Sequence, residues 1–331
     1  MIFFYHKGSD YFDQWTSPFF EELQYYNNLS KDQIAVHYGL TIFKKKNLKD
    51  YLSTFYKNIF LLHGGLTFFL DNNVELYLNK LNLFDCIIVN EKIAKEYLEI
   101  LGYTNVFFIG HGLPTNSVRY KCKCLDCYDQ KKYEFIYSGY IHHKEHKRFL
   151  KLIKSYKHLY TSYNLSKRAY LMNYFLFFGL NKKIGLDQKE LLNFQHMSKA
   201  SICSNLLYLN TNDFKNFQNL KKINQLKDYE FIFKNKVAPN WKGRLFELAI
   251  TKTLMLVKFD NWNIIESEFQ LEPDKDFLYF NTLNDLKEIM NDVSFNFHKF
   301  IPITESAFSK VLSMGSLNYY NKIRSLDFLK N

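Results

Sequence analysis

The sequence predicts an α/β protein made of two Rossmann-like domains that face a cleft. Short apolar runs alternate with amphipathic segments along most of the 331 residues, which is the pattern of parallel sheets with crossover helices. Glycines follow several of the apolar runs, as at Gly110 and Gly139. The chain is also long enough for two domains, each with its own core.

Composition sets limits on the class of protein. Hydrophobic residues make up 47% of the chain and charged residues 23%, which indicates a globular protein. The net charge of +11 leaves anionic membrane surfaces, phosphate-bearing ligands and nucleic acid open as partners. Abundant Lys and Asn are also typical of an AT-rich genome, so we expect no nucleic-acid partner.

No signal peptide is evident, because the opening residues MIFFYHKGSD lack a basic segment ahead of a long apolar core. The most apolar runs, near 59–70 and 169–180, are too short to span a bilayer. We therefore expect a cytoplasmic protein and leave open peripheral contact with the inner face of the cell membrane.

The first alternation lies within 1–118, the expected N-terminal domain. A helix is expected to begin near Pro18, a second has its apolar face on residues 74–81, and a third covers 91–103 with Gly102 as its stop. The expected strands are 1–6, 33–38, 58–62, 85–90 and 105–109. Residues 119–131 are polar and without period, and we interpret them as the linker.

The linker holds Cys122, Cys124 and Cys127 among the five cysteines of the chain, an odd number that argues against a disulfide framework. Structural zinc requires four regularly spaced ligands, and the nearest histidines lie at 142–146. The sequence leaves open whether these thiols bind a metal or stay reduced.

The second alternation gives an expected C-terminal domain at 132–303, followed by a helical tail at 304–331. Thr282 and Asp285 form a capping box for a helix over 283–292. The other expected helices are 142–156, 187–197 and 214–226. The expected strands are 133–137, one within 169–180, 200–207, 229–233 and 254–259.

The segment from 239 to 266 organises the rest of this domain. Asn240 is a plausible N-cap for a helix that places Arg244 and Glu247 on a shared side. Lys242, Arg244 and the free N–H groups of a helix start would suit an anion such as a diphosphate. An ordinary helix–strand unit with a solvated charged face would give the same pattern.

The run RLFELAITKTLMLV at 244–257 resembles the donor segment of GT-B glycosyltransferases of the group-1, spore-maturation-like (CgeB-like) kind. The acidic-aromatic run at 272–280 continues the resemblance, which covers about 60 residues. It implies a two-domain GT-B fold in which Glu247 binds the ribose of a nucleotide. It also implies that Lys242 and Arg244 bind the diphosphate.

The resemblance extends in pattern to the first strand of the C-terminal domain. In such enzymes that strand ends at a glycine, here Gly139, and a following basic residue often reaches the donor phosphate. Lys147 and Arg148 are therefore candidates, although a solvated helix face would explain them equally well. The resemblance also implies that the last helix, within 304–331, crosses back to the N-terminal domain.

Two departures limit what the resemblance implies. Many relatives carry a second Glu eight residues before the first, where this chain has Pro239. Many also have a Gly before the strand, where this chain has Lys252 and Thr253. The first departure leaves open how the sugar is recognised and whether the reaction retains or inverts its configuration.

An inverting transfer needs a base that deprotonates the acceptor hydroxyl. His63, Asp10 and His111 each follow an expected strand of the N-terminal domain, with His63 the leading candidate because Gly64 and Gly65 follow it. GT-B enzymes generally stabilise the leaving group without a metal. The resemblance thus implies no cofactor beyond the nucleotide-sugar co-substrate.

The expected function is transfer of a sugar from a nucleotide-diphosphate donor to a glycan, lipid-linked or protein acceptor, in bacterial surface-polysaccharide biosynthesis. A non-catalytic α/β protein that binds a nucleotide or another anion is the alternative. A basic nucleic-acid-binding protein is a third, less favoured hypothesis. The P-loop, zincin and nucleophile-elbow motifs are all missing from the sequence.

Overall fold

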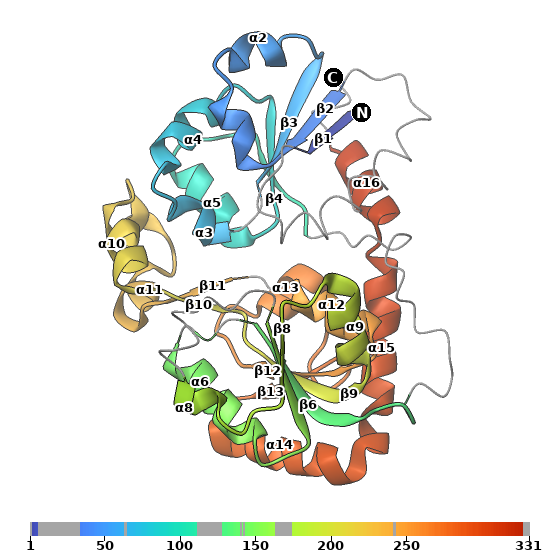
Figure 1. Cartoon of the computed structure of the whole chain (residues 1–331). Helices are drawn as coiled ribbons and strands as arrows, with labels where there is room; N and C mark the ends of the chain where they lie inside the picture. Colours follow the sequence, from blue (N-terminus) through green and yellow to red (C-terminus); the bar gives the residue numbers. More distant parts are fainter. Residues whose placement is uncertain are drawn as a thin grey trace. The chain divides into compact units, whose positions relative to one another are not determined.

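The computed structural model describes residues 2–5, 34–62, 65–110, 128–139, 141, 143–162, 174–240 and 243–326. The chain divides into two compact units, each with its own parallel sheet (Figure 1). Unit 1 comprises Met1–Ser117, Leu206–Trp241 and Met314–Asn331, and unit 2 comprises Val118–Asn205 and Lys242–Ser313. Residues 206–241, assigned from the sequence to the 132–303 domain, thus group with unit 1.

The sheet of unit 1 has five parallel strands in the sequential order β1-β2-β3-β4-β5. All five coincide with strands expected from the sequence. They are β1 (Ile2–Tyr5), β2 (Ile34–Tyr38), β3 (Lys57–Leu62), β4 (Cys86–Val89) and β5 (Val106–Phe108). The helices that connect them are η1 (Leu40–Lys44), α2 (Leu48–Leu52), α3 (Gly65–Phe69), α4 (Val74–Leu81) and α5 (Lys92–Ile100).

Sequential order has a consequence for the two faces of this sheet. Right-handed crossovers that always step in one direction place their helices on one face. On that face Phe60 of β3 packs against helix-side aromatic rings such as Phe43, at 4.9 Å between centroids. Ile59 and Leu61 point to the opposite face of the sheet and pack with α16 (Ser316–Arg324). Helix α16 therefore covers the face that the crossover helices do not cover.

The segment 206–239 adds a small helical layer to unit 1. A two-stranded antiparallel ribbon, β10 (Leu206–Tyr208) with β11 (Val237–Pro239), encloses α10 (Thr211–Asn219), η2 (Ile223–Gln225) and α11 (Tyr229–Asn235). The Tyr97 hydroxyl on α5 donates to the Lys221 carbonyl at 2.9 Å, and the Lys227 N–H donates to Glu96. These bonds fix the layer to the core of unit 1.

The predicted strand at 229–233 is wrong, because this stretch is part of α11. Aromatic residues favour strands, but Tyr229 and Phe233 stand one helical turn apart and their rings pack at 5.6 Å. Phe217 of α10 stacks on Tyr229 at 5.8 Å. Packing between two helices outweighs the intrinsic strand preference here.

The sheet of unit 2 has six strands in the order β13-β12-β9-β6-β7-β8, all parallel. Numbered by their appearance in this unit, the strands run 6-5-4-1-2-3, which is the Rossmann order. They are β6 (Tyr133–Ser138), β7 (His158–Ser162), β8 (Lys182–Ile184), β9 (Ser198–Cys203), β12 (Leu254–Lys258) and β13 (Leu278–Phe280).

The helices of unit 2 pack on both sides of this sheet (Figure 1). Residues of α6, α8 and α14 share one buried cluster with the strands, while α12 packs against α9 and α15. The helices are α6 (Lys144–Ile153), α8 (Tyr174–Phe177), α9 (Gln188–His196), α12 (Arg244–Ile250), α13 (Ile264–Phe269), α14 (Leu283–Asn296), η3 (Phe297–Phe300) and α15 (Ile301–Ser313).

Two features of unit 2 differ from the sequence prediction. The described part of the predicted strand within 169–180 contains α8 instead, and β7 and β8 occupy stretches where no strand was predicted. The capping box predicted at Thr282 is confirmed at the start of α14. Asp187 is the N-cap of α9, where it forms a second capping box with Glu190. In the described part of the chain, each helix is too short or too polar to cross a membrane.

Buried His37 in β2 gives unit 1 a predicted pH dependence. Burial lowers its pKa from 6.5 to about 4, although its ring is 3.1 Å from Asn58 Oδ1. The unfolded chain therefore binds a proton below pH 6.5 that the folded chain accepts only near pH 4. We expect this residue to cost about 2 kcal/mol of stability between pH 7.5 and pH 5.

Urea unfolding at the two pH values, followed by circular dichroism, measures this loss. In His37→Gln the part of the pH dependence that belongs to His37 should disappear. An equal pH dependence in the variant and the native protein would contradict the assignment.

Candidate functional site

The strand order of unit 2 identifies where a ligand would bind. From β6 the chain moves outward to β7 and β8, then returns to the other side of β6 with β9. At such a switch point a crevice opens outside the carboxyl ends of the two neighbouring strands. Gly139 follows β6 at this edge, and Ser204 and Asn205 follow β9.

Gly139 and Arg244 are in direct contact at this edge. Gly139 has φ +127°, and a Cβ built on it would lie 2.8 Å from Nη2 of Arg244 and 2.9 Å from Nη1. The backbone is held in place, since the Gly139 N–H donates to the Thr161 carbonyl and the Tyr160 hydroxyl donates to the Gly139 carbonyl, both at 3.0 Å. A Cβ at position 139 would therefore displace this guanidinium and strain the backbone.

Hydroxyl groups accompany the guanidinium in a small pocket. The Thr161 hydroxyl donates to Ser138 Oγ at 2.7 Å, and both side chains are buried. The pocket is lined by Ser138, Gly139, Thr161, Ser162, Leu186, Leu191 and Arg244. A planar cation with adjacent hydroxyls is the chemistry that binds phosphate oxygens in pairs.

Glu247 lies one turn further along α12 and is only 3% exposed. Its Oε2 accepts a hydrogen bond from Gln195 Nε2 at 3.0 Å, so its carboxylate is engaged with α9. Burial raises the pKa of the Cys203 thiol at the end of β9 to about 12, with Arg244 opposing and Glu247 adding to the rise. Both charges therefore act on the carboxyl end of β9.

The start of α12 differs from the sequence prediction. Gly243, not Asn240, occupies the N-cap position, and Asn240 instead follows β11 as a buried residue. The helix has only seven residues, of which Arg244 is the first and Glu247 the fourth. The prediction of Asn240 as N-cap is wrong, because α12 begins only at Arg244.

The structure does not bring all candidate donor residues together. Arg148 is exposed on α6 and lines a separate groove of about 320 Å³ with Lys258, Phe280 and the start of α14. Lys147 is half-buried on the same helix and belongs to neither lining. Lys242 lies outside the described residues, as do the proposed bases His63, Asp10 and His111.

Sequence reasoning missed two buried polar residues at the carboxyl edges of the sheets. Glu91, after β4, is 3% exposed, and a Cβ on Gly65 would lie 1.9 Å from its Oε2. Asn205, after β9, is fully buried, and neither atom of its side-chain amide has a hydrogen-bond partner among the residues that the structure describes. In the sequence, the only feature that could have identified these two residues is their position, since each is a polar residue close after an apolar run.

A metal site finds no support in the part of the chain that the structure describes. Those residues contain no cluster of three or more His, Cys, Asp or Glu side chains that could hold an ion. Cys86 and Cys203 are buried free thiols. Cys122, Cys124 and Cys127 lie outside the described residues.

The chain matches no protein-family model, and no curated protein matches it in sequence. Solved structures resemble it at low identity. TarM aligns with a TM-score of 0.56 and 12% identity over 91% of this chain, which spans 56% of TarM. Anabaena HepE, solved with UDP and glucose, aligns with a TM-score of 0.59 and 11% identity. The alignment covers 89% of this chain and 78% of HepE.

Sucrose-phosphate synthase from Thermosynechococcus elongatus gives a TM-score of 0.58 and 9% identity over 92% of this chain and 75% of the enzyme. These neighbours are glycosyltransferases of the GT-B fold. At such identities the likeness concerns the fold alone. The predicted fold class is confirmed: the chain has the two Rossmann-like domains of the GT-B fold.

Proposed function

We propose that this protein is a glycosyltransferase that uses a nucleotide-diphosphate sugar as donor. The observation that supports this most directly is the contact between Gly139 and Arg244 at the switch point of a Rossmann-order sheet. UDP is the first nucleotide to test, since HepE and a TarM variant were solved with UDP.

The reaction breaks the bond between the anomeric carbon and the β-phosphate oxygen, which keeps the electron pair. The acceptor oxygen forms the new bond to the anomeric carbon, and its proton passes to a base. Arg244 would stabilise the charge that develops on the leaving diphosphate, and no metal would be required for this role. His63, Asp10 and His111 remain the proposed bases, and Lys242 and Lys147 proposed phosphate contacts.

Glu247 is proposed to bind the ribose, as in the spore-maturation-like enzymes that 244–257 resembles. The Glu247 carboxylate already accepts a hydrogen bond from Gln195. To bind the ribose, it would have to accept a second hydrogen bond from a ribose hydroxyl. Arg148 is a weaker proposal for the donor phosphate, since it lines a different groove. The acceptor is proposed to be a glycan, lipid or protein in bacterial surface-polysaccharide assembly.

A non-catalytic nucleotide-binding protein is the second candidate. The observation in its favour is Pro239, which ends β11 here and stands where many enzymes of the resembling family have the second Glu, eight residues before the position of Glu247. Nucleotide binding would be common to both functions. Hydrolysis or transfer of the sugar belongs to the first alone.

Gly139→Ala should weaken UDP binding by about tenfold or more, because the new Cβ displaces a guanidinium whose charge-assisted bonds contribute about 1.5–3 kcal/mol. Isothermal titration calorimetry measures the change. Gly185→Ala is the matched control, since Gly185 also has positive φ (+75°) in unit 2 but no atom within 4 Å of its added Cβ. Equal affinities in the two variants would remove Gly139 from the site.

Arg244→Ala should lower donor turnover by about 10²–10³, the usual cost of removing one group that stabilises developing charge. Hydrolysis of a panel of radiolabelled nucleotide sugars measures this, with circular dichroism to verify folding. Arg148→Ala should have a much smaller effect, since its groove is separate. The site assignment fails if the native protein turns over no donor, or if Arg244→Ala turns donors over at the native rate.

A further inference from the structure

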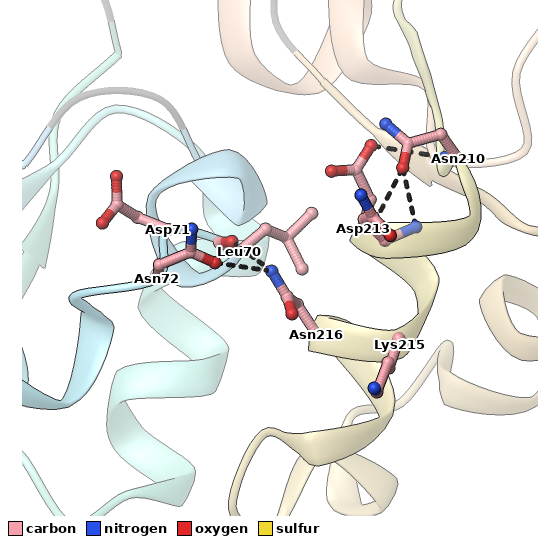
Figure 2. Close-up of a pocket in the computed structure, with 8 residues that line it drawn as sticks. Leu70, Asp71, Asn72, Asn210, Asp213, Lys215 and Asn216 are labelled. Atoms are coloured by element: carbon pink, nitrogen blue, oxygen red, sulfur yellow. Dashed lines mark hydrogen bonds between the residues drawn. The ribbon is translucent and has the colours of Figure 1, made fainter.

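A polar groove of about 550 Å³ lies within unit 1, between the turn after α3 and the first half of α10 (Figure 2). Its volume is within the range of small-molecule sites, about 300–1,000 Å³. Such sites are usually lined by apolar side chains, whereas here the one apolar lining residue is Leu70. The lining residues are Leu70, Asp71, Asn72, Asn210, Asn212, Asp213, Lys215 and Asn216.

Hydrogen bonds fix the two walls of the groove to each other. The Asn216 side-chain amide on α10 donates to the Leu70 carbonyl at 2.9 Å and to Asn72 Oδ1 at 3.4 Å. Asn210 and Asp213 form the capping box that starts α10. The groove is therefore a formed feature of unit 1 and not a gap between independent loops.

Several polar atoms of the lining take no part in these hydrogen bonds. Asn72 Nδ2 and Asn210 Nδ2 are donors, and Asn216 Oδ1 and Asp213 Oδ1 are acceptors, without a hydrogen bond to other residues that the structure describes. Figure 2 shows Asn72 on one wall and Asn210 with Asp213 on the other. Mixed donors and acceptors suit hydroxyl groups, each of which both donates and accepts.

The charge of the lining argues against an anionic ligand. Asp71 and Asp213 are acidic and Lys215 is basic, which gives the lining a net charge of 1 − 2 = −1. The whole chain carries +11, so the groove departs from the basic character of the protein. A phosphate-bearing chain would gain little here, whereas an uncharged sugar would meet only hydrogen-bonding groups.

We propose that this groove binds an uncharged oligosaccharide, which serves as the acceptor glycan. This inference rests on the proposed transferase function and specifies its acceptor class. The atoms left over in the lining would bond to hydroxyls of successive sugar rings, with Leu70 against an apolar ring face.

An array of uncharged and anionic oligosaccharides provides the test, and saturation-transfer NMR with the best binder locates the contact. The native protein should bind uncharged glycans. Asn212→Arg places a long cation in the groove from an exposed position of α10 and should weaken that binding by about tenfold or more. Asn72→Arg blocks the opposite wall and should act in the same direction.

Asn219→Arg is the matched control, because Asn219 is also an exposed asparagine of α10 but does not line the groove. It should bind glycans as the native protein does. Binding of anionic glycans alone, no glycan binding, or equal losses in Asn212→Arg and Asn219→Arg would each overturn the inference. UDP titration of the same samples separates the two proposals. If the protein binds UDP but no oligosaccharide on the array, only the proposal for the groove is contradicted.

Discussion

The geometry of the candidate donor site depends on the absence of a side chain at position 139. The strand order brings the end of β6 beside the end of β9, and α12 delivers Arg244 to that edge. Any Cβ at position 139 would occupy the space that the guanidinium fills. Hydrogen bonds to Thr161 and Tyr160 of β7 hold the backbone of Gly139 in this position. One glycine thus permits a cation to lie at the point where this class of sheet opens toward a ligand.

Much of the fold follows from the sequence because apolar runs and caps are local signals. The five described strands of the parallel sheet in unit 1 and the capping box of α14 could be predicted this way. β7 could not, since its stretch His158–Ser162 mixes polar and apolar residues without a clear period. α11 was mistaken for a strand because its aromatic residues favour strands until Phe217 is available to pack against them. These errors occur where a distant partner decides the local structure.

The candidate site shows the same division. Arg244 and Gly139 could be identified from the sequence, because a strand-ending glycine and a basic helix start are local features. Which face of α6 carries Arg148 could not be identified, and the structure places that side chain in another groove. Glu91 and Asn205 belong to no motif, and only burial singles them out. Buried polar groups at sheet edges are thus features that emerge from the fold.

The assignment of 206–241 to unit 1 changes how the chain's functions are connected. This segment supplies α10 to the polar groove for which we propose an oligosaccharide ligand, and β11 then ends at Pro239, five positions before Arg244. The Asn216 bonds to the turn after α3 hold the segment on unit 1, while α12 belongs to unit 2. The proposed glycan would bind to α10, which precedes α12 in the chain.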